Sequence, residues 1–234
     1  MIELNHVKKS YGSTKALQGV SLTLETGKII GIAGENGSGK STLLKSIAGV
    51  GKIDSGSIRI DGTAVSRKHA EEIAYLPDAD MFYSYFTVEQ LFSYYRSQFA
   101  DFNELKAKEV LDFLEVSPSS KMKNLSKGMR GRAKMAATLG RESRYYLMDE
   151  PFSGLDPMVR ADLVKGLIRF TDLERQTLIL STHEIREVET LLDELVLLKN
   201  GKVLAHRHLD EIRDETGMDM VEWMTKETKA GARG

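Results

Sequence analysis

The sequence feature that most constrains the fold is an apolar strand pattern that leads directly into a glycine-rich segment and a helix. The run Ile29–Ala33 has no alternating polar residue, which is typical of a central strand covered on both faces. Helical spacing begins at Lys40 and stops before Gly49, a residue type that commonly ends helices. The residues between fit the phosphate-binding pattern G-x-x-x-x-G-K-[ST]: Gly34-Glu35-Asn36-Gly37-Ser38-Gly39-Lys40-Ser41.

The residue types of this segment suit a nucleoside triphosphate. Glycines let consecutive backbone N–H groups converge on the β-phosphate because no Cβ stands in the way, and the helix N-terminus adds partial positive charge. We expect Lys40 to bridge the β- and γ-phosphates of ATP, Ser41 to offer its hydroxyl to Mg²⁺, and Thr42 to reach the α-phosphate. The expected nucleotide-binding residues here are Gly34, Asn36, Gly37, Ser38, Gly39, Lys40, Ser41 and Thr42.

A second apolar strand pattern, Tyr145–Met148, ends in two carboxylates, Asp149 and Glu150. A lone carboxylate at a strand end is often structural. Downstream of a phosphate-binding loop, however, this order predicts Asp149 near the Mg²⁺ ion and Glu150 at the attacking water.

Strand and helix patterns alternate along the rest of the chain, which predicts an α/β fold with a mostly parallel sheet. Between residues 78 and 125 the pattern is mainly helical, from Met81 to about Phe113. Cap signals predict where helices begin, and an Asn-Gly pair predicts a hairpin: Thr87 with Gln90, Asn103, Ser126, Asp156 with Pro157, Thr182, and Asn200–Gly201. We expect a polar tail over residues 210–234 that ends in a frayed helix.

Taken together, the motifs resemble the ATP-binding subunit of an ABC transporter, over a stretch from Ile2 to about His206. Four further segments carry the resemblance, in the order of the family: Tyr11, Leu125-Ser126-Lys127-Gly128-Met129, Ser153-Gly154-Leu155-Asp156 and His183. They correspond to the adenine-stacking aromatic, the signature sequence, the D-loop and the switch histidine. The resemblance implies one ATPase domain over residues 1–209, with an antiparallel N-terminal β portion and a helical lobe inserted at about 79–140.

The resemblance also implies that two such subunits, either identical or close paralogues, bind MgATP between them. Each site would combine the phosphate-binding loop of one subunit with Ser126 and Gly128 of the other. His183 would contact the γ-phosphate, although a histidine at a strand end is more often held by a local hydrogen bond. Tyr11 would stack on adenine, although alone it is an ordinary loop aromatic. Asp156 is fully explained as a helix cap and can have a second role between subunits.

The chain departs from the pattern of the family at two places. Asp78 stands where the family usually has a glutamine that offers its carbonyl to Mg²⁺, and the shorter, charged carboxylate reaches the metal only through water or, in the open state, not at all. In the signature, Lys127 and Met129 replace the commonest glycine and glutamine. Lys127 adds charge near a γ-phosphate or belongs to a solvated basic face with Arg130 and Lys134, and we favour the second interpretation. This signature form resembles that of bacterial exporter subunits.

Most of the phenylalanines and tyrosines of the chain fall within the helical lobe: Phe82, Tyr83, Tyr85, Phe86, Phe92, Tyr94, Tyr95, Phe99, Phe102 and Phe113. One interpretation is that they form the core of the lobe. The other is a groove that takes a short helix of a membrane subunit. Adjacent aromatics cannot all face one side of a helix, which favours some exposure.

Composition narrows the function classes. The chain has no cysteine, which excludes disulfides and thiolate catalysis, and its net charge of -1 gives no general attraction to nucleic acid. No apolar run is long enough to cross a bilayer. We therefore expect a cytoplasmic ATP hydrolase, bound to the inner face of the membrane through a polytopic permease and driving transport. The alternative is a soluble ABC ATPase that acts as an assembly or scaffold factor.

Overall fold

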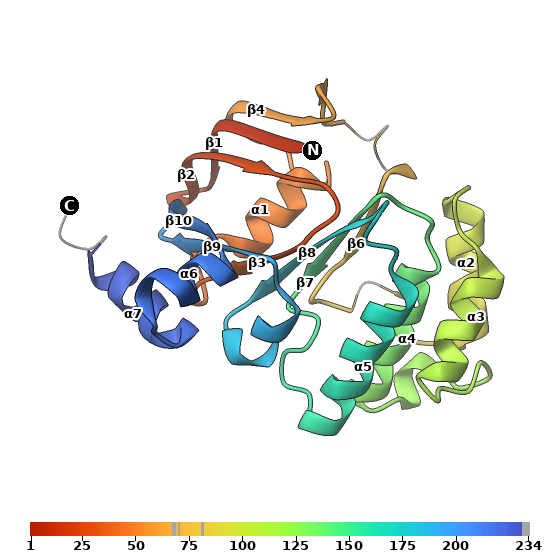
Figure 1. The fold of residues 1–234 in the computed structure, drawn as a ribbon. Coiled ribbons are helices and arrows are strands. Elements are labelled where there is room, and N and C mark those ends of the chain that lie inside the picture. Colours follow the sequence, from red (N-terminus) through yellow and green to blue (C-terminus); the bar gives the residue numbers. More distant parts are fainter. Residues whose placement is uncertain (67–68, 70, 81, 231–234) are drawn as a thin grey trace.

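The computed structural model describes residues 1–66, 69, 71–80 and 82–230, and it contains two β-sheets with helices packed against them (Figure 1). The smaller sheet is antiparallel, with the order β2-β1-β4-β5. Its strands are β1 (Ile2–Tyr11), β2 (Thr14–Leu24), β4 (Ser55–Ile60) and β5 (Thr63–Ala64). In β1, Ile2 lies opposite Leu24 on one side and Ile60 on the other. The predicted N-terminal antiparallel portion is confirmed.

The larger sheet has the order β10-β9-β3-β8-β7-β6 and is parallel except for its edge strand β10. Its strands are β3 (Ile29–Ala33), β6 (Ile73–Leu76), β7 (Tyr145–Asp149), β8 (Thr177–Thr182), β9 (Glu194–Lys199) and β10 (Lys202–His208). The predicted hairpin joins β9 to β10, where Asn200 and Gly201 have φ values of 48° and 72°, as a type I′ turn requires. The carboxyl ends of β3, β8 and β7 meet at one edge, which positions the site.

Helix α1 (Lys40–Ile47) packs between the two sheets, as Figure 1 shows. Strand β3 packs against a hydrophobic core cluster on each of its two faces. Ile30 and Ile32 belong to the core cluster that includes α1 and the antiparallel sheet, whereas Ile29 and Ala33 belong to the cluster on the other face. Alternate side chains of a strand point to opposite faces, so an uninterrupted apolar run is needed where both faces are covered.

The helical lobe contains α2 (Val88–Gln98), α3 (Glu104–Phe113) and α4 (Lys127–Leu139), and α5 (Pro157–Phe170) packs beside α4. Each predicted cap is present. The Thr87 hydroxyl accepts the N–H of Gln90 while the Gln90 side chain accepts the N–H of Thr87. Asn103, Ser126 and Asp156 cap the other three helices through side-chain oxygens that accept backbone N–H groups. Local sequence therefore determines where these helices begin.

Two predicted helical segments are wrong. The hydroxyl of Thr182 does accept the N–H of Glu184 at 2.9 Å, but two short 3₁₀ turns follow instead of an α-helix: η3 (Ile185–Glu187) and η4 (Glu189–Leu191). Residues 82–86 form turns and bends before α2, and Met81, where we placed the start of the helical pattern, lies outside the described residues. A further 3₁₀ turn, η2, spans Met122–Asn124.

The C-terminal segment is more ordered than its polar composition predicts. It forms α6 (Leu209–Thr216) and α7 (Met220–Ala230), and four apolar side chains from it are buried in the same core cluster as the larger sheet: Leu209, Ile212, Met220 and Trp223. The last four residues lie outside the described part. In the described part of the chain, no helix has the length and apolar character needed to span a bilayer.

Candidate nucleotide-binding site

The phosphate-binding loop connects β3 to α1 as predicted, and backbone contacts hold it in place. A Cβ at Gly34 would lie 2.2 Å from the carbonyl oxygen of Leu198, and one at Gly39 would lie 2.5 Å from that of Ala16. Gly39 also has a φ of 110°, which L side chains rarely adopt. These two positions therefore require glycine. The loop ends at Lys40, which is buried and whose ammonium donates to the carbonyl oxygen of Gly34 at 2.8 Å.

Strand β7 places Asp149 beside the first turn of α1. The Ser41 hydroxyl donates to Asp149 Oδ1 at 2.9 Å, and the hydroxyl of Ser181, on the neighbouring strand β8, donates to the same oxygen at 2.7 Å. Tyr75, on β6, lies on the other side, with its hydroxyl 3.4 Å from Asp149 Oδ2. Burial, followed by the negative charge of Asp149, raises the pKa of Tyr75 well above its usual range, so Tyr75 remains a neutral donor.

Glu150 connects the phosphate-binding loop with the switch histidine. Its Oε1 lies 3.2 Å from Lys40 Nζ, and its Oε2 lies 2.8 Å from His183 Nδ1. Its backbone N–H donates to the Ser181 hydroxyl at 2.9 Å. Lys40, Glu150 and His183 therefore meet at the carboxyl edge of the sheet, although they come from three separate elements.

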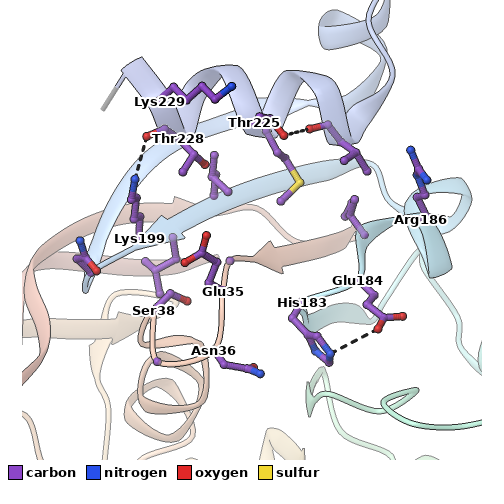
Figure 2. A pocket seen from close by; sticks show the side chains of 18 of the residues that line it. Glu35, Asn36, Ser38, His183, Glu184, Arg186, Lys199, Thr225, Thr228 and Lys229 are labelled. Atoms are coloured by element: carbon purple, nitrogen blue, oxygen red, sulfur yellow. Dashed lines mark hydrogen bonds and ion pairs between the residues drawn. The ribbon is translucent and has the colours of Figure 1, made fainter. Parts of the chain in front are cut away.

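A cavity of about 690 Å³ opens next to these residues, between the loop, the segment after His183 and helix α7. Figure 2 shows α7 on one side of it, with the loop residues Glu35, Asn36 and Ser38 on the other and His183 with Glu184 at one end. The Lys199 ammonium donates to the carbonyl oxygen of Thr228 at 2.9 Å. Because α7 forms one wall of the cavity, the C-terminal helix lies within reach of the nucleotide-binding residues.

Among the described residues, no group of three or more His, Cys, Asp or Glu side chains is arranged to hold a metal ion. The oxygens of Ser41 and Asp149 nevertheless fit Mg²⁺. This hard cation prefers oxygen ligands and commonly takes only one or two from protein side chains, with substrate phosphates and water completing its shell. Asp78 is exposed and lines a cavity of about 220 Å³ that Asp149 and Glu150 also line.

The signature residues lie at the start of α4. Ser126 caps the helix by accepting the N–H of Met129 at 3.2 Å, and a Cβ at Gly128 would lie 3.3 Å from both Cγ atoms of Val159 on α5. Within the described part of the chain, no hydrogen bond or ion pair joins Ser126 or Gly128 to the phosphate-binding loop. The structure therefore does not bring these predicted site residues together with Lys40 inside one chain.

The solvated basic face that we predicted on α4 is wrong for two of its three members. Arg130 pairs with Asp80 at 3.1 Å, and Lys134, whose side chain is only 13% exposed, pairs with the same carboxylate at 3.4 Å. Burial lowers the pKa of Lys134 more than Asp80 raises it. Lys127 is exposed and lies beside Gly154 of the D-loop. Of the four α4 cations, Arg130 and Lys134 thus hold Asp80 at the start of the lobe, and Arg132 pairs with Asp162 of α5 at 2.6 Å. Only Lys127 faces solvent without such a pair among the described residues.

Tyr11, at the end of β1, is 52% exposed, and the ammonium of Lys9 lies over its ring at 5.1 Å. The ring is thus available for stacking, but among the described residues no hydrogen bond or ion pair joins Tyr11 to the loop. Sequence reasoning missed Ser181 and Tyr75, which contact Asp149. A serine near the end of an apolar strand has no distinguishing sequence signal, and the contact exists only because β8 lies beside β7.

Comparisons with known proteins agree with this geometry. Residues 17–153 match the family model described as ABC transporter. The chain is 35% identical over 213 residues to the Nod factor export ATP-binding protein I of Rhizobium sp., covering 87% of this chain and 69% of that protein. It is 31% identical over 220 residues to the probable sulfate/thiosulfate import ATP-binding protein CysA of Chlorella vulgaris, covering 91% and 93% of the two chains.

A solved structure of the ATP-binding subunit of an ABC transporter superposes on 97% of this chain and 99% of its own, with a TM-score of 0.84 and 27% sequence identity. Because the superposition covers nearly the whole of both chains, it includes both sheets, the helical lobe and the C-terminal helices. The chain belongs to the ABC transporter family and is one of its ATP-binding, ATP-hydrolysing subunits.

Proposed function

We propose that this chain is the motor of an ABC transporter and that it hydrolyses MgATP between two ATPase subunits. The observation that carries the proposal is the contact chain from Lys40 through Glu150 to His183. In-line attack of water on the γ-phosphate needs a cation on the phosphates, a group that polarises the water and a group that positions the γ-phosphate. Lys40, Glu150 and His183 take these roles in that order.

The loop binds the phosphates through its backbone N–H groups and through the start of α1. Ser41 and Asp149 would hold Mg²⁺, and the ion would supply positive charge that favours binding of the phosphates. The hydrogen bond between these side chains, at 2.9 Å, keeps both oxygens at one place. Asp78 would reach the ion only through water, from the neighbouring cavity that it lines, and Tyr11 would stack on the adenine.

The second half of each site comes from the other subunit, through Ser126 and Gly128. Both lie at the start of α4, a helix of 13 residues with no acidic residue in its first turn, so its N-terminus favours an anion. Among the described residues, no hydrogen bond or ion pair joins it to a residue of the phosphate-binding loop of the same chain. A phosphate from a second ATPase subunit, either identical or a close paralogue, supplies the missing partner.

The membrane partner docks on the lobe. Tyr83, Tyr85 and Tyr94 are 54%, 62% and 42% exposed. Tyr83 and Tyr94 border a groove of about 380 Å³ that also includes Pro77 and Phe86. The rings of Tyr83 and Tyr85 stack at 5.4 Å. Exposed aromatics around a concave patch are typical of protein interfaces. A short helix of a polytopic permease fits this groove, which places the subunit at the inner face of the membrane.

We assign the transporter to the export direction. The Leu125–Met129 form of the signature and the similarity to a Nod factor export protein support this assignment, and the similarity to an import protein shows that sequence likeness extends to both directions. The nucleic-acid-acting class stays disfavoured because the chain carries a net charge of -1.

The test of hydrolysis is Glu150→Gln, which keeps the shape of the side chain and removes its charge. The variant should bind ATP, lose at least about 100-fold in turnover because the water is no longer polarised, and accumulate as a dimer on size-exclusion chromatography with MgATP. Glu174→Gln, at an exposed site after α5, is the matched control and should behave as wild type. Normal turnover by Glu150→Gln would show that the assigned role is wrong.

A further inference from the structure

Arg160, in the first turn and a half of α5, connects the D-loop to the segment that carries the switch histidine. Its Nη2 donates to the carbonyl oxygen of Leu155, in the D-loop, at 3.1 Å, and pairs with Glu187 Oε1 in η3. The carboxylate of Asp156 caps the start of this helix. The N–H of Arg160 donates to the Asp156 carbonyl oxygen at 3.1 Å, which fixes Arg160 relative to the D-loop. One guanidinium therefore bridges the D-loop and the segment that follows His183.

Both partners of this ion pair are withdrawn from solvent. The side chains of Arg160 and Glu187 are 23% and 9% exposed. Arg160 Nε is buried without a hydrogen-bond partner among the described residues, although an unpaired buried donor is costly. Removing one member of such a pair leaves the other charge buried and uncompensated. The ion pair between Arg160 and Glu187 is therefore held more firmly than an ion pair at the surface.

Glu187 is in turn linked to the catalytic centre. Its backbone N–H donates to the carbonyl oxygen of Glu184 at 3.2 Å, and Glu184 Oε1 lies 3.7 Å from His183 Nε2 (Figure 2). His183 then contacts Glu150 at 2.8 Å. Buried Ile185 and Val188 anchor the backbone on each side of Glu187.

We propose that Arg160 is a positioning residue for hydrolysis, which holds His183 in place by tying the Leu155 carbonyl of the D-loop to Glu187. This inference rests on the proposed role of His183. When the D-loop shifts as subunits meet or part, the guanidinium transmits the shift to the switch segment of the same chain. Coupling of this kind needs a continuous set of contacts with few soft links, and the chain from Leu155 through Arg160, Glu187, Glu184 and His183 to Glu150 provides one.

The Glu184–Glu187 pair should make the contacts between Arg160 and His183 depend on pH. Burial, followed by the hydrogen bond to Glu184, raises the pKa of Glu187 to about 7, while Arg160 lowers it and His183 lowers it further. Other charged groups around the turn include Glu189 in η4, Arg186 and, before α7, Asp219; the last two pair with each other at 3.7 Å. Loss of the Arg160 charge therefore moves the Glu187 titration to higher pH.

The experiment compares Arg160→Gln with wild type by steady-state ATP hydrolysis of the purified chain between pH 6 and 9. We expect kcat to fall by about 10- to 100-fold, as for a misplaced catalytic group, with an unchanged KM for ATP and a pH–rate inflection displaced upward. Arg160→Lys, which keeps the pairing with Glu187, should recover part of the rate. Arg169→Gln, an exposed arginine on the same helix, is the matched control.

Two variants separate this inference from the proposed function. In Glu187→Gln the inflection near pH 7 should disappear, because its titrating carboxyl is gone. His183→Ala should abolish turnover; if it does not, the proposed function fails. If His183→Ala is inactive while Arg160→Gln keeps the wild-type kcat, or loses rate without any displacement of the inflection, Arg160 is only structural and the inference is overturned.

Discussion

Glu150 follows directly after the last residue of β7 and has a φ of 49°, a left-handed conformation that is unusual for a residue other than glycine. Such a conformation costs about 1–3 kcal/mol and is found mainly where the surrounding structure enforces it. The hydrogen bond from the Glu150 N–H to Ser181 and the contacts of its carboxylate with Lys40 and His183 supply that enforcement. The turn is what aims the carboxylate away from the strand and into the site.

Asp78 is the residue at which this chain differs most clearly from the pattern of its family. Its carbonyl oxygen accepts a hydrogen bond from Lys134 at 3.0 Å, so the backbone is fixed while the carboxylate lies at the surface. In Asp78→Gln, the side chain is longer by one methylene and offers a neutral carbonyl. We expect ATP binding and hydrolysis within about threefold of wild type, because surface substitutions usually change free energies by less than about 0.5 kcal/mol, and altered stimulation by the permease.

The measurement for Asp78→Gln is ATP titration together with hydrolysis rates, with and without the membrane partner. Asp214→Gln, the same substitution at an exposed position of α6, controls for loss of charge. Complete loss of ATP binding by the Asp78 variant would contradict the prediction.

At the scale of elements, the helical lobe combines a fixed base with an exposed aromatic edge. Arg130 and Lys134 of α4 hold Asp80 at the start of the lobe, whereas Tyr83 and Tyr85 face solvent. The predicted aromatic core is correct for Phe92 and Phe102, which are buried. The aromatics therefore divide between the two interpretations that the sequence left open.

The variant Tyr83→Ala with Tyr85→Ala tests the exposed edge. Because aromatic anchors at interfaces contribute about 2 kcal/mol or more, the affinity for the permease should fall about 30-fold while the Kd for ATP stays unchanged. Co-purification from detergent extracts and nucleotide titration measure the two effects. Phe170→Ala, which removes a ring that does not line the groove, is the control. Undiminished co-purification would eliminate the groove as the docking site.

At the scale of the whole molecule, the two halves of the proposed site lie on different parts of the chain. Figure 1 shows α1 between the two sheets and α4 in the lobe on the far side of the larger sheet. We propose that a chain with this arrangement completes its site only when a second subunit places its α4 over the loop. The division of residues 1–209 into one ATPase domain also remains a proposal, since α6 and α7 share its core.

Mixing two inactive variants tests this arrangement. Lys40→Ala lacks a working loop, and Ser126→Ala lacks a working signature and loses a helix cap at a cost of about 1 kcal/mol. A mixed dimer contains one intact site if the halves come from different subunits, and none if they come from the same chain. Single-turnover ATP hydrolysis should therefore reappear on mixing. An inactive mixture of folded dimers would show that each chain uses its own Ser126.

The sequence by itself determined the features that depend on neighbouring residues. These are the strand Ile29–Ala33 and the loop after it, the caps at Thr87, Asn103, Ser126 and Asp156, and the turn at Asn200–Gly201, because caps, turns and periodicity act over a few residues. The motif order also selected Lys40, Ser41, Asp149, Glu150 and His183, which the structure brings to one edge of the sheet.

Only the tertiary structure decided the contacts between residues that are distant along the chain. Packing converted the segment after Thr182 into 3₁₀ turns and buried Trp223 of a tail that reads as polar. It also set Ser181 against Asp149 and Arg160 against Glu187. The physical reason is that strand order and helix packing bring side chains from distant segments together. A local sequence pattern does not contain the information about which of these side chains will be in contact.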